Sequence, residues 1–175
     1  EINLPIKRQE ILDDWANSTI EGSLEHDKRE KEVIENGITW NGKHYPYLNK
    51  NILEITPEDV GVVPEIMVWD HEKKLCGLAD LPIFDAGVIH MLDYKTNKEI
   101  TTSGFMGRKM TGPFKNIDDC SLGKYSGQLY GYLKMACDLS GLKPGKCVII
   151  HTKSEKYKRK EDKYIPCIDV SKQIE

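Results

Sequence analysis

The stretch GLADLPIFDAGVIHMLDYKT, residues 77–96, decides the fold of this chain. Its β-branched and aliphatic residues predict two strands, over residues 75–84 and 88–96, with a turn at Asp85-Ala86-Gly87 between them. A third strand is expected just before, over residues 62–69, because another apolar run precedes a polar turn there. Three strands joined by short turns indicate an antiparallel meander.

Helices are predicted on both sides of this meander. Apolar residues at helical spacing predict one helix over residues 6–18 and a second from residue 19 or 23 to residue 36, which Gly37 ends. A long helix is predicted over residues 121–139, with its apolar residues on one side.

The remaining elements are short. Asn41-Gly42 predicts a tight hairpin turn, because both residues tolerate positive φ. Two closing strands are expected over residues 147–151 and 164–170. The whole order favours an α/β or α+β class with a central mixed β-sheet flanked by helices.

Three charged residues lie on the two central strands. Asp93 and Lys95 are two positions apart, so their side chains share a face, and a short turn brings Asp80 beside them. Two converging carboxylates suit a hard divalent cation. A lysine beside them could offset negative charge in a transition state. The alternative is that Asp93 and Lys95 form an ordinary surface ion pair.

Length and composition indicate one globular domain over residues 1–175. Hydrophobic residues make up 39% and charged residues 30%, and no apolar run approaches the roughly 20 residues of a membrane span. We therefore expect no membrane partner. The chain opens on Glu1 rather than methionine, which leaves open whether a segment precedes it.

The cysteines argue for a reducing compartment. Their number is odd, they are widely spaced, and no C-x-x-C occurs, so neither a zinc ribbon nor an iron–sulfur cluster is expected. We expect a cytoplasmic or other DNA-containing reducing compartment, such as a phage or bacterial host cytoplasm or an organelle. The five positions are Cys76, Cys120, Cys137, Cys147 and Cys167.

Two polar segments are candidate phosphate contacts. The net charge is -3, but residues 143–163 are locally basic, and they could meet phosphates or form a solvated hairpin tip. Residues 101–119 are glycine-rich and long for a loop, so they are a lid or partly disordered. The predicted nucleic-acid contacts are Arg108, Lys109, Lys124, Lys158 and Arg159.

The pattern of glycine, two residues, Asp80, then an apolar strand ending in Asp93-Tyr-Lys95-Thr resembles the RecB-type branch of the PD-(D/E)XK nucleases. That branch includes the nuclease domain of RecB, lambda-type exonucleases and the mitochondrial genome maintenance exonucleases. The proline that names the motif is absent, since Ala79 precedes Asp80, and members of this branch often lack that proline. The resemblance covers residues 22–133 in scattered motifs, and it implies a restriction-endonuclease-like core.

The resemblance also implies roles for residues outside the central strands. Gly22 with His26 matches an early helix whose histidine binds metal, and an imidazole beside two carboxylates fits Mg²⁺ or Mn²⁺. Gln128 and Tyr132, one helical turn apart, match a glutamine and tyrosine near the site. One or two ions are expected. The predicted ligands are His26, Asp80, Asp93, the backbone carbonyl of Tyr94 and Glu65.

The function that the resemblance implies is metal-dependent hydrolysis of DNA phosphodiester bonds, by an exonuclease or a nuclease of single strands or flaps. Two alternatives stay open: a structure-specific or restriction-like endonuclease, and a non-catalytic DNA-binding module that keeps the fold. DNA ends, single strands or flaps are the expected partners. No G-x-x-x-x-G-K-[ST] motif occurs, so a helicase or other recombination partner would be a separate chain. Neither the strand polarity nor the oligomeric state follows from the sequence.

Overall fold

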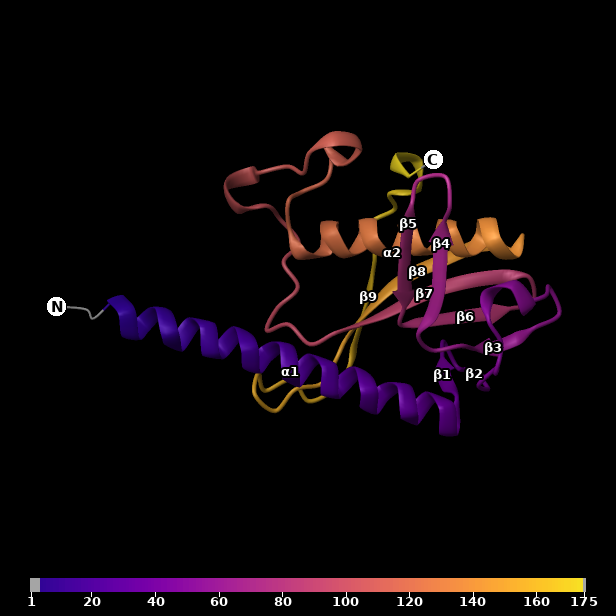
Figure 1. Cartoon of the computed structure of the whole chain (residues 1–175), viewed down its shortest axis with the longest axis horizontal. Helices are drawn as coiled ribbons and strands as arrows, with labels where there is room; N and C mark the ends of the chain where they lie inside the picture. The colour runs from indigo at the N-terminus through magenta and orange to yellow at the C-terminus, as the bar shows by residue number, and fades with distance from the viewer. Residues whose placement is uncertain (1–3, 175) are drawn as a thin grey trace.

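The structure, a computed structural model, describes the backbone of residues 4–174 and the side chains of residue 17 and residues 19–174. Two α-helices and a mixed five-stranded sheet make up most of this part, so the class is α+β (Figure 1). The sheet has the order β3-β6-β7-β8-β9, and only the β7–β8 pair is parallel. Its strands are β3 (Val60–Val62), β6 (Leu81–Asp85), β7 (Val88–Lys95), β8 (Lys143–His151) and β9 (Lys163–Pro166).

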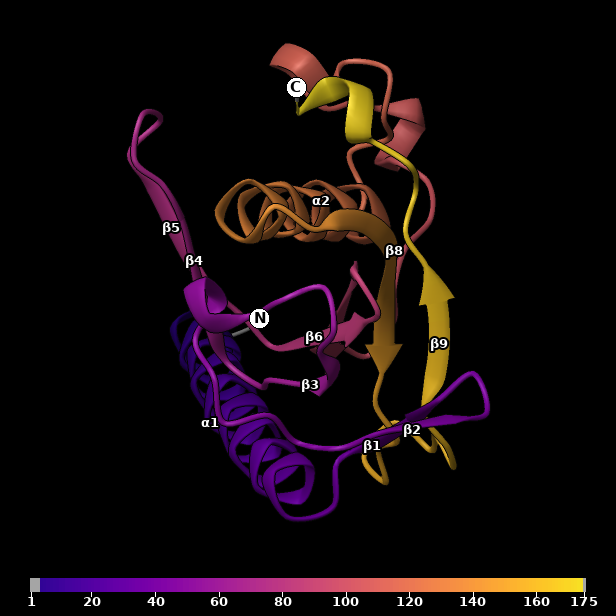
Figure 2. The ribbon, with the colours of Figure 1, turned by 90° about the vertical axis from the view of Figure 1, so that its right-hand side faces the viewer.

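The two helices lie on opposite faces of the sheet, as Figure 2 shows. Helix α1 (Leu4–Asn36) runs continuously through the two helices that the sequence predicted, so the expected interruption near residues 18–23 was wrong. Gly22 costs only about 1 kcal/mol relative to alanine inside a helix, which is too little to end one without a proline or a cap. The predicted apolar face of residues 6–16 lies outside the described side chains.

Helix α2 (Ser121–Ser140) matches its prediction closely. It ends at Gly141, whose φ of 73° is the left-handed conformation of a helix C-cap. Leu129 and Leu133 are buried against the sheet, as the helical period of their apolar neighbours predicted. The side of α2 that carries Leu129 and Leu133 therefore faces the sheet.

Each face of the sheet has its own core. Alternation along β7 sends Met91 toward α2 and Leu92 toward α1. Asp93 and Lys95 follow Met91 at two-residue steps, so they share the α2 face, whereas Tyr94 packs in the core on the α1 face. The charged residues of β7 thus continue an apolar row.

The predicted meander is more broken than expected. The run over residues 62–69 is divided at Pro64-Glu65 into β3 and β4 (Ile66–Asp70), because proline lacks a donor and Glu65 has a φ of 52°. The run over residues 75–84 is divided at Asp80 into β5 (Leu75–Ala79) and β6. β4 and β5 pair as a separate hairpin that packs against α2.

Both breaks fall at one corner of the molecule. The Glu65 amide donates to the carbonyl of Asp80 over 3.0 Å, which ties the two interruptions together where the β4–β5 hairpin leaves the sheet. Glu65 and Asp80 therefore lie close together, each at an interruption between two strands.

The other hairpin forms as predicted. β1 (Ile38–Trp40) and β2 (Lys43–Tyr45) are antiparallel, and their turn residues Asn41 and Gly42 have φ values of 49° and 77°. Two positive φ values in a two-residue turn match the right-handed twist of the strands.

The last strands differ in extent from their predictions. β8 begins at Lys143, before the predicted residue 147, because it pairs alongside β7 from Val88 onward. β9 ends at Pro166 rather than at residue 170. Residues 101–119 contain two short 3-10 turns, Phe105–Gly107 and Gly112–Phe114. None of the helices in the part described here has the length and apolarity needed to cross a bilayer.

Candidate metal-binding site

The end of the β6–β7 pair brings two aspartates together. Leu81 of β6 pairs with Leu92 of β7, so the next residues outward on these antiparallel strands are Asp80 and Asp93. The Asp80 carboxylate accepts the backbone N–H of Tyr94 over 3.2 Å. This bond holds the Asp80 side chain against β7, beside Asp93.

Two further side chains converge on Asp80 from distant parts of the chain. His26 of α1 places Nδ1 3.4 Å from Asp80 Oδ2. Glu65 comes from the break between β3 and β4, and one ligand atom from each of His26, Glu65 and Asp80 lies within 4.8 Å of the others. All three side chains are partly exposed, so the cluster is open to solvent.

Asp93 is the most buried carboxylate of the group, with 3% of its side chain exposed. Its Oδ2 lies 2.6 Å from Lys95 Nζ. Lys95 is therefore the close charged partner of this buried carboxylate. Burying a carboxylate is costly unless it is paired, and here the charge of one lysine acts on both Asp93 and Asp80.

Burial raises the pKa of every carboxyl group in this cluster. Desolvation and the charge of Asp80 raise the pKa of Asp93 to about 6, although Lys95 opposes the shift. Desolvation likewise raises the pKa of Asp80 and of Glu65. Burial lowers the pKa of Lys95, but the charge of Asp93 more than offsets it, so the lysine stays protonated. The site thus holds more negative charge than its own cations stabilise.

These residues fit a divalent cation. Carboxylate oxygens with one imidazole are a donor set that Mg²⁺ and Mn²⁺ accept. The pKa values of Asp80, Asp93 and Glu65 are all raised, as expected for neighbouring carboxylates that share little positive charge. The backbone carbonyl of Tyr94 stays a predicted ligand.

Lys95 has a second neighbour that the sequence did not reveal. The ring centroid of Tyr125, in the second turn of α2, lies 4.7 Å from Lys95 Nζ. The Tyr125 hydroxyl donates to the Asn97 side chain over 2.9 Å. The helical period could have suggested Tyr125, because it lies three residues before Gln128 on the same face.

The predicted pair Gln128 and Tyr132 lies farther along that face. The Gln128 amide is exposed and donates to the Tyr132 hydroxyl over 3.1 Å. The Tyr132 ring packs on Gly77 of β5, where an added Cβ would come within 2.5 Å of the ring. Among the described contacts, this pair reaches the β4–β5 hairpin rather than the carboxylates, so its role in the site stays a prediction.

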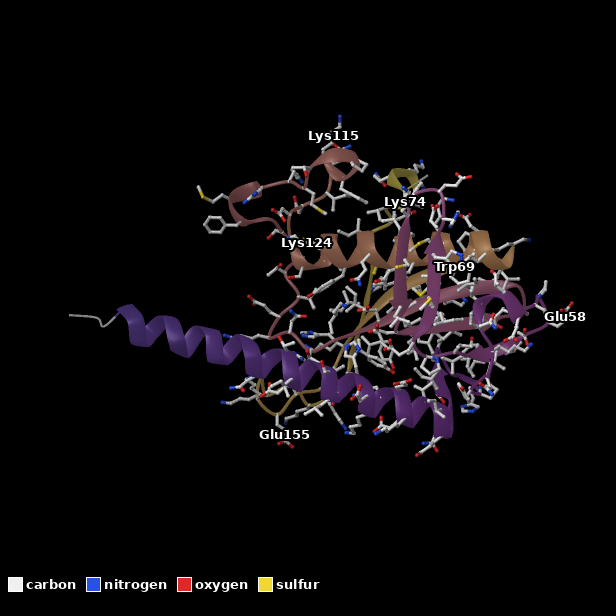
Figure 3. The ribbon with its side chains drawn as sticks, in the orientation of Figure 1. Glu58, Trp69, Lys74, Lys115, Lys124 and Glu155 are labelled. Atoms are coloured by element: carbon white, nitrogen blue, oxygen red, sulfur yellow. The ribbon has the colours of Figure 1, made fainter. Side chains whose placement is uncertain are left out.

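Most of the predicted nucleic-acid contacts already have protein partners. Arg108 and Lys124 both pair with Asp119, at 3.2 and 2.9 Å, and Lys109 pairs with Asp118; Figure 3 labels Lys124 at the start of α2. Arg159 donates to three backbone carbonyls, those of Thr152, Asn97 and Lys98. Lys158 is exposed on the β8–β9 connection and has a φ of 54°.

Comparison with known proteins finds no relative of this chain. No family model, no curated protein and no solved structure matches it.

Proposed function

We propose that the protein is a metal-dependent deoxyribonuclease with a restriction-endonuclease-like core, and that it hydrolyses DNA phosphodiester bonds at the Asp80–Asp93–Lys95 site. The observation that carries the proposal is the convergence of five side chains from four separate segments on the end of β7: His26, Glu65, Asp80, Asp93 and Lys95.

The fold supports the proposal through its sheet. A mixed sheet with a helix on each face is compatible with the core of PD-(D/E)XK nucleases. The strand β7 that carries Asp93 and Lys95 is central in this sheet, and its end is fixed by β6 on one side and β8 on the other. Fold alone does not define activity, so the weight of the proposal rests on the site.

The chemistry follows from the donor set. A bound Mg²⁺ or Mn²⁺ would polarise the phosphate and lower the pKa of a water molecule. His26, Glu65, Asp80 and Asp93 would hold the cation or cations through their imidazole and carboxylate groups. Lys95, already protonated and fixed at the edge of this cluster, would stabilise the negative charge that builds on the phosphate during attack.

A surface ion pair is a poor account of Asp93 and Lys95. Only 3% of the Asp93 side chain and 16% of the Lys95 side chain are exposed. Burying two charges costs several kcal/mol per ion before their attraction is counted, and well-packed apolar residues would be as stable or more stable there. A pair of this kind at an open cluster of acids supports a functional role rather than a structural one.

The test is digestion of end-labelled linear DNA and of circular single- and double-stranded DNA with Mg²⁺ or Mn²⁺. We expect cleavage that needs the metal and stops with a chelator. Cleavage of circular substrates would identify an endonuclease, and release of terminal nucleotides from linear substrates alone would identify an exonuclease. DNA binding without cleavage of any substrate would instead support a non-catalytic module.

A further inference from the structure

The ammonium group of Lys95 is enclosed from two sides. Asp93 Oδ2 lies 2.6 Å from Nζ, and the centroid of the Tyr125 ring lies 4.7 Å from it. An ammonium over the face of an aromatic ring is attracted by the ring quadrupole, more strongly where water is excluded. The Lys95 side chain is 16% exposed, so both contacts act in a largely desolvated place.

The Tyr125 ring is itself held from outside the helix. Its hydroxyl donates to Asn97 Oδ1 over 2.9 Å, and Asn97 lies only two residues after Lys95 in the chain. The tyrosine thus bridges α2 to the segment that continues β7. A ring with both its helix backbone and its hydroxyl fixed has little freedom to turn away from Lys95.

The backbone of Asn97 is fixed in turn by the β8–β9 region. The Asn97 carbonyl accepts a hydrogen bond from His151 Nε2 over 2.7 Å and one from Arg159 over 3.3 Å. Arg159 also donates to the carbonyls of Lys98 and Thr152. The amide of Thr152 donates to the Lys95 carbonyl over 3.0 Å. The turn after Lys95 is therefore tied to the end of β8 and to the β8–β9 connection on both sides of Asn97.

We infer that Tyr125, fixed by its hydrogen bond to Asn97, is a positioning residue for Lys95 and holds the ammonium group at the carboxylate cluster. The inference rests on the proposed function, and it deepens it by naming what orients the lysine. A lysine side chain has four rotatable bonds and a strongly hydrated head, so nothing in the residue itself keeps it in one place. A charge displaced by about 1 Å from its productive position can cost about a hundredfold in rate.

The network also assigns a use to Arg159. Its guanidinium donates to the carbonyls of Asn97 and Lys98, just after Lys95, and to that of Thr152, whose amide donates to the Lys95 carbonyl. This arrangement differs from a phosphate contact, for which an arginine would present its donors to solvent.

Two substitutions separate the parts of this arrangement. Tyr125→Leu removes the ring, and Tyr125→Phe keeps the ring but removes the hydrogen bond to Asn97. Tyr130→Leu is the matched control, because Tyr130 is another partly buried tyrosine of α2 that packs in the core away from Lys95. Each variant is compared with wild type in single-turnover DNA cleavage, oligonucleotide affinity, calorimetric Mn²⁺ binding and melting temperature.

We expect Tyr125→Leu to slow single-turnover cleavage roughly a hundredfold while oligonucleotide and Mn²⁺ affinities stay within about twofold. Tyr125→Phe should slow it about fivefold, the effect of one hydrogen bond. The decisive comparison uses a Lys95→Ala background. A residue that acts through Lys95 loses its effect once the lysine is gone, so adding Tyr125→Leu should change nothing there.

Two results overturn the inference. One is cleavage by Tyr125→Leu within twofold of wild type, and the other is an equal slowing in the Lys95→Ala background, which would mean that Tyr125 acts on the substrate itself. A readout independent of cleavage is the NMR spectrum of lysine labelled with ¹³C at Cε. The Lys95 ε protons should be shifted upfield by the Tyr125 ring in wild type and Tyr125→Phe, and unshifted in Tyr125→Leu. Unshifted wild-type signals overturn the inference even if the protein cleaves DNA, whereas shifted signals in a protein that cleaves none refute only the proposed function.

Discussion

Lys50 and Asp59 form an ion pair with the same 2.6 Å separation as Lys95 and Asp93, yet the pKa values of the two aspartates move in opposite directions. The Lys50 hydrogen bond and the backbone amide of Thr56 hold the pKa of Asp59 below its ordinary value. Burial and the neighbouring charge of Asp80 raise the pKa of Asp93 to about 6. The distance to a lysine therefore does not by itself decide the pKa of an aspartate.

The difference lies in the surroundings of each carboxylate. Asp59 lies near the surface and accepts hydrogen bonds from Lys50, from the Thr56 amide and from the Thr56 hydroxyl. Asp93 lies in the sheet beside a second carboxylate, and the charge of Lys95 acts on both Asp93 and Asp80. Asp59 is thus stabilised by its own donors, whereas Asp93 shares its cation with a second carboxylate. We interpret this excess of negative charge around Asp93 as a cation-binding site.

The largest expected effect is on metal binding, which should depend on Asp80 but not on Asp59. Asp80→Ala should abolish Mn²⁺ binding and DNA cleavage together, because it removes a predicted ligand and the hydrogen bond to Tyr94. Asp59→Ala should leave both unchanged. Calorimetric titration of each variant with Mn²⁺ checks this. Wild-type Mn²⁺ affinity in Asp80→Ala would show that the cation binds elsewhere.

The next effect is a difference in how stability depends on pH in the metal-free protein. Asp93 keeps its proton to about pH 6 in the folded state but loses it near its ordinary pKa when unfolded. The folded chain then binds more protons in this window, so the Asp93 contribution to the free energy of unfolding falls as pH rises. Asp59, with its lowered pKa, contributes stability that appears as pH rises above the unfolded pKa and is lost on acidification.

Substitution to asparagine removes each contribution. The stability of Asp93→Asn relative to wild type should rise by on the order of 2–3 kcal/mol between about pH 4 and pH 7, since one pKa unit corresponds to about 1.4 kcal/mol. The stability of Asp59→Asn relative to wild type should fall as pH rises through the acidic range. Urea unfolding in the presence of a chelator measures both. If the stability of both variants relative to wild type changed with pH in the same direction, the pKa values of Asp59 and Asp93 would not be shifted in opposite directions.

The smallest effect concerns the Lys50–Asp59 pair alone. Lys50→Ala should lower the free energy of unfolding by at most about 1 kcal/mol, because the pair is only partly buried and Asp59 keeps its hydrogen bonds from Thr56. The loss should shrink at high salt, which screens charges that water reaches. Urea unfolding at low and high salt is the measurement, and a loss of several kcal/mol would place Lys50 among the buried charges instead.

The central part of the site was predictable from the sequence. Alternation along a strand placed Asp93 and Lys95 on one face, and the short turn at Asp85-Ala86-Gly87 placed Asp80 beside them. These are local relations, which strand geometry and a tight turn fix before any tertiary packing is known.

The breaks in the strands were harder to predict. Pro64 was a visible interruption, but Asp80 stands in a run that reads as one continuous strand over residues 75–84. Its break depends on the β4–β5 hairpin turning away to pack on α2, a contact between segments far apart in sequence. The same non-local packing brings Glu65 to Asp80.

Tyr125 shows the remaining limit. The helical period identifies Tyr125, Gln128 and Tyr132 as one face of α2, but it does not say which of them lies over Lys95. That depends on how far α2 is shifted along the sheet, which Leu129 and Leu133 determine by packing into the core. If α2 were shifted by one turn along the sheet, Gln128 rather than Tyr125 would lie over Lys95.

The most direct test of the central claim compares the two lysines in single-turnover cleavage of a 5′-labelled oligonucleotide with Mn²⁺. Lys95→Ala should cleave roughly a thousandfold more slowly than wild type, a loss of about 3–4 kcal/mol in transition-state stabilisation, with oligonucleotide and Mn²⁺ binding largely kept. Lys50→Ala should cleave at the wild-type rate. Cleavage by Lys95→Ala within a few-fold of wild type would contradict the assigned active site and the nuclease function proposed from it.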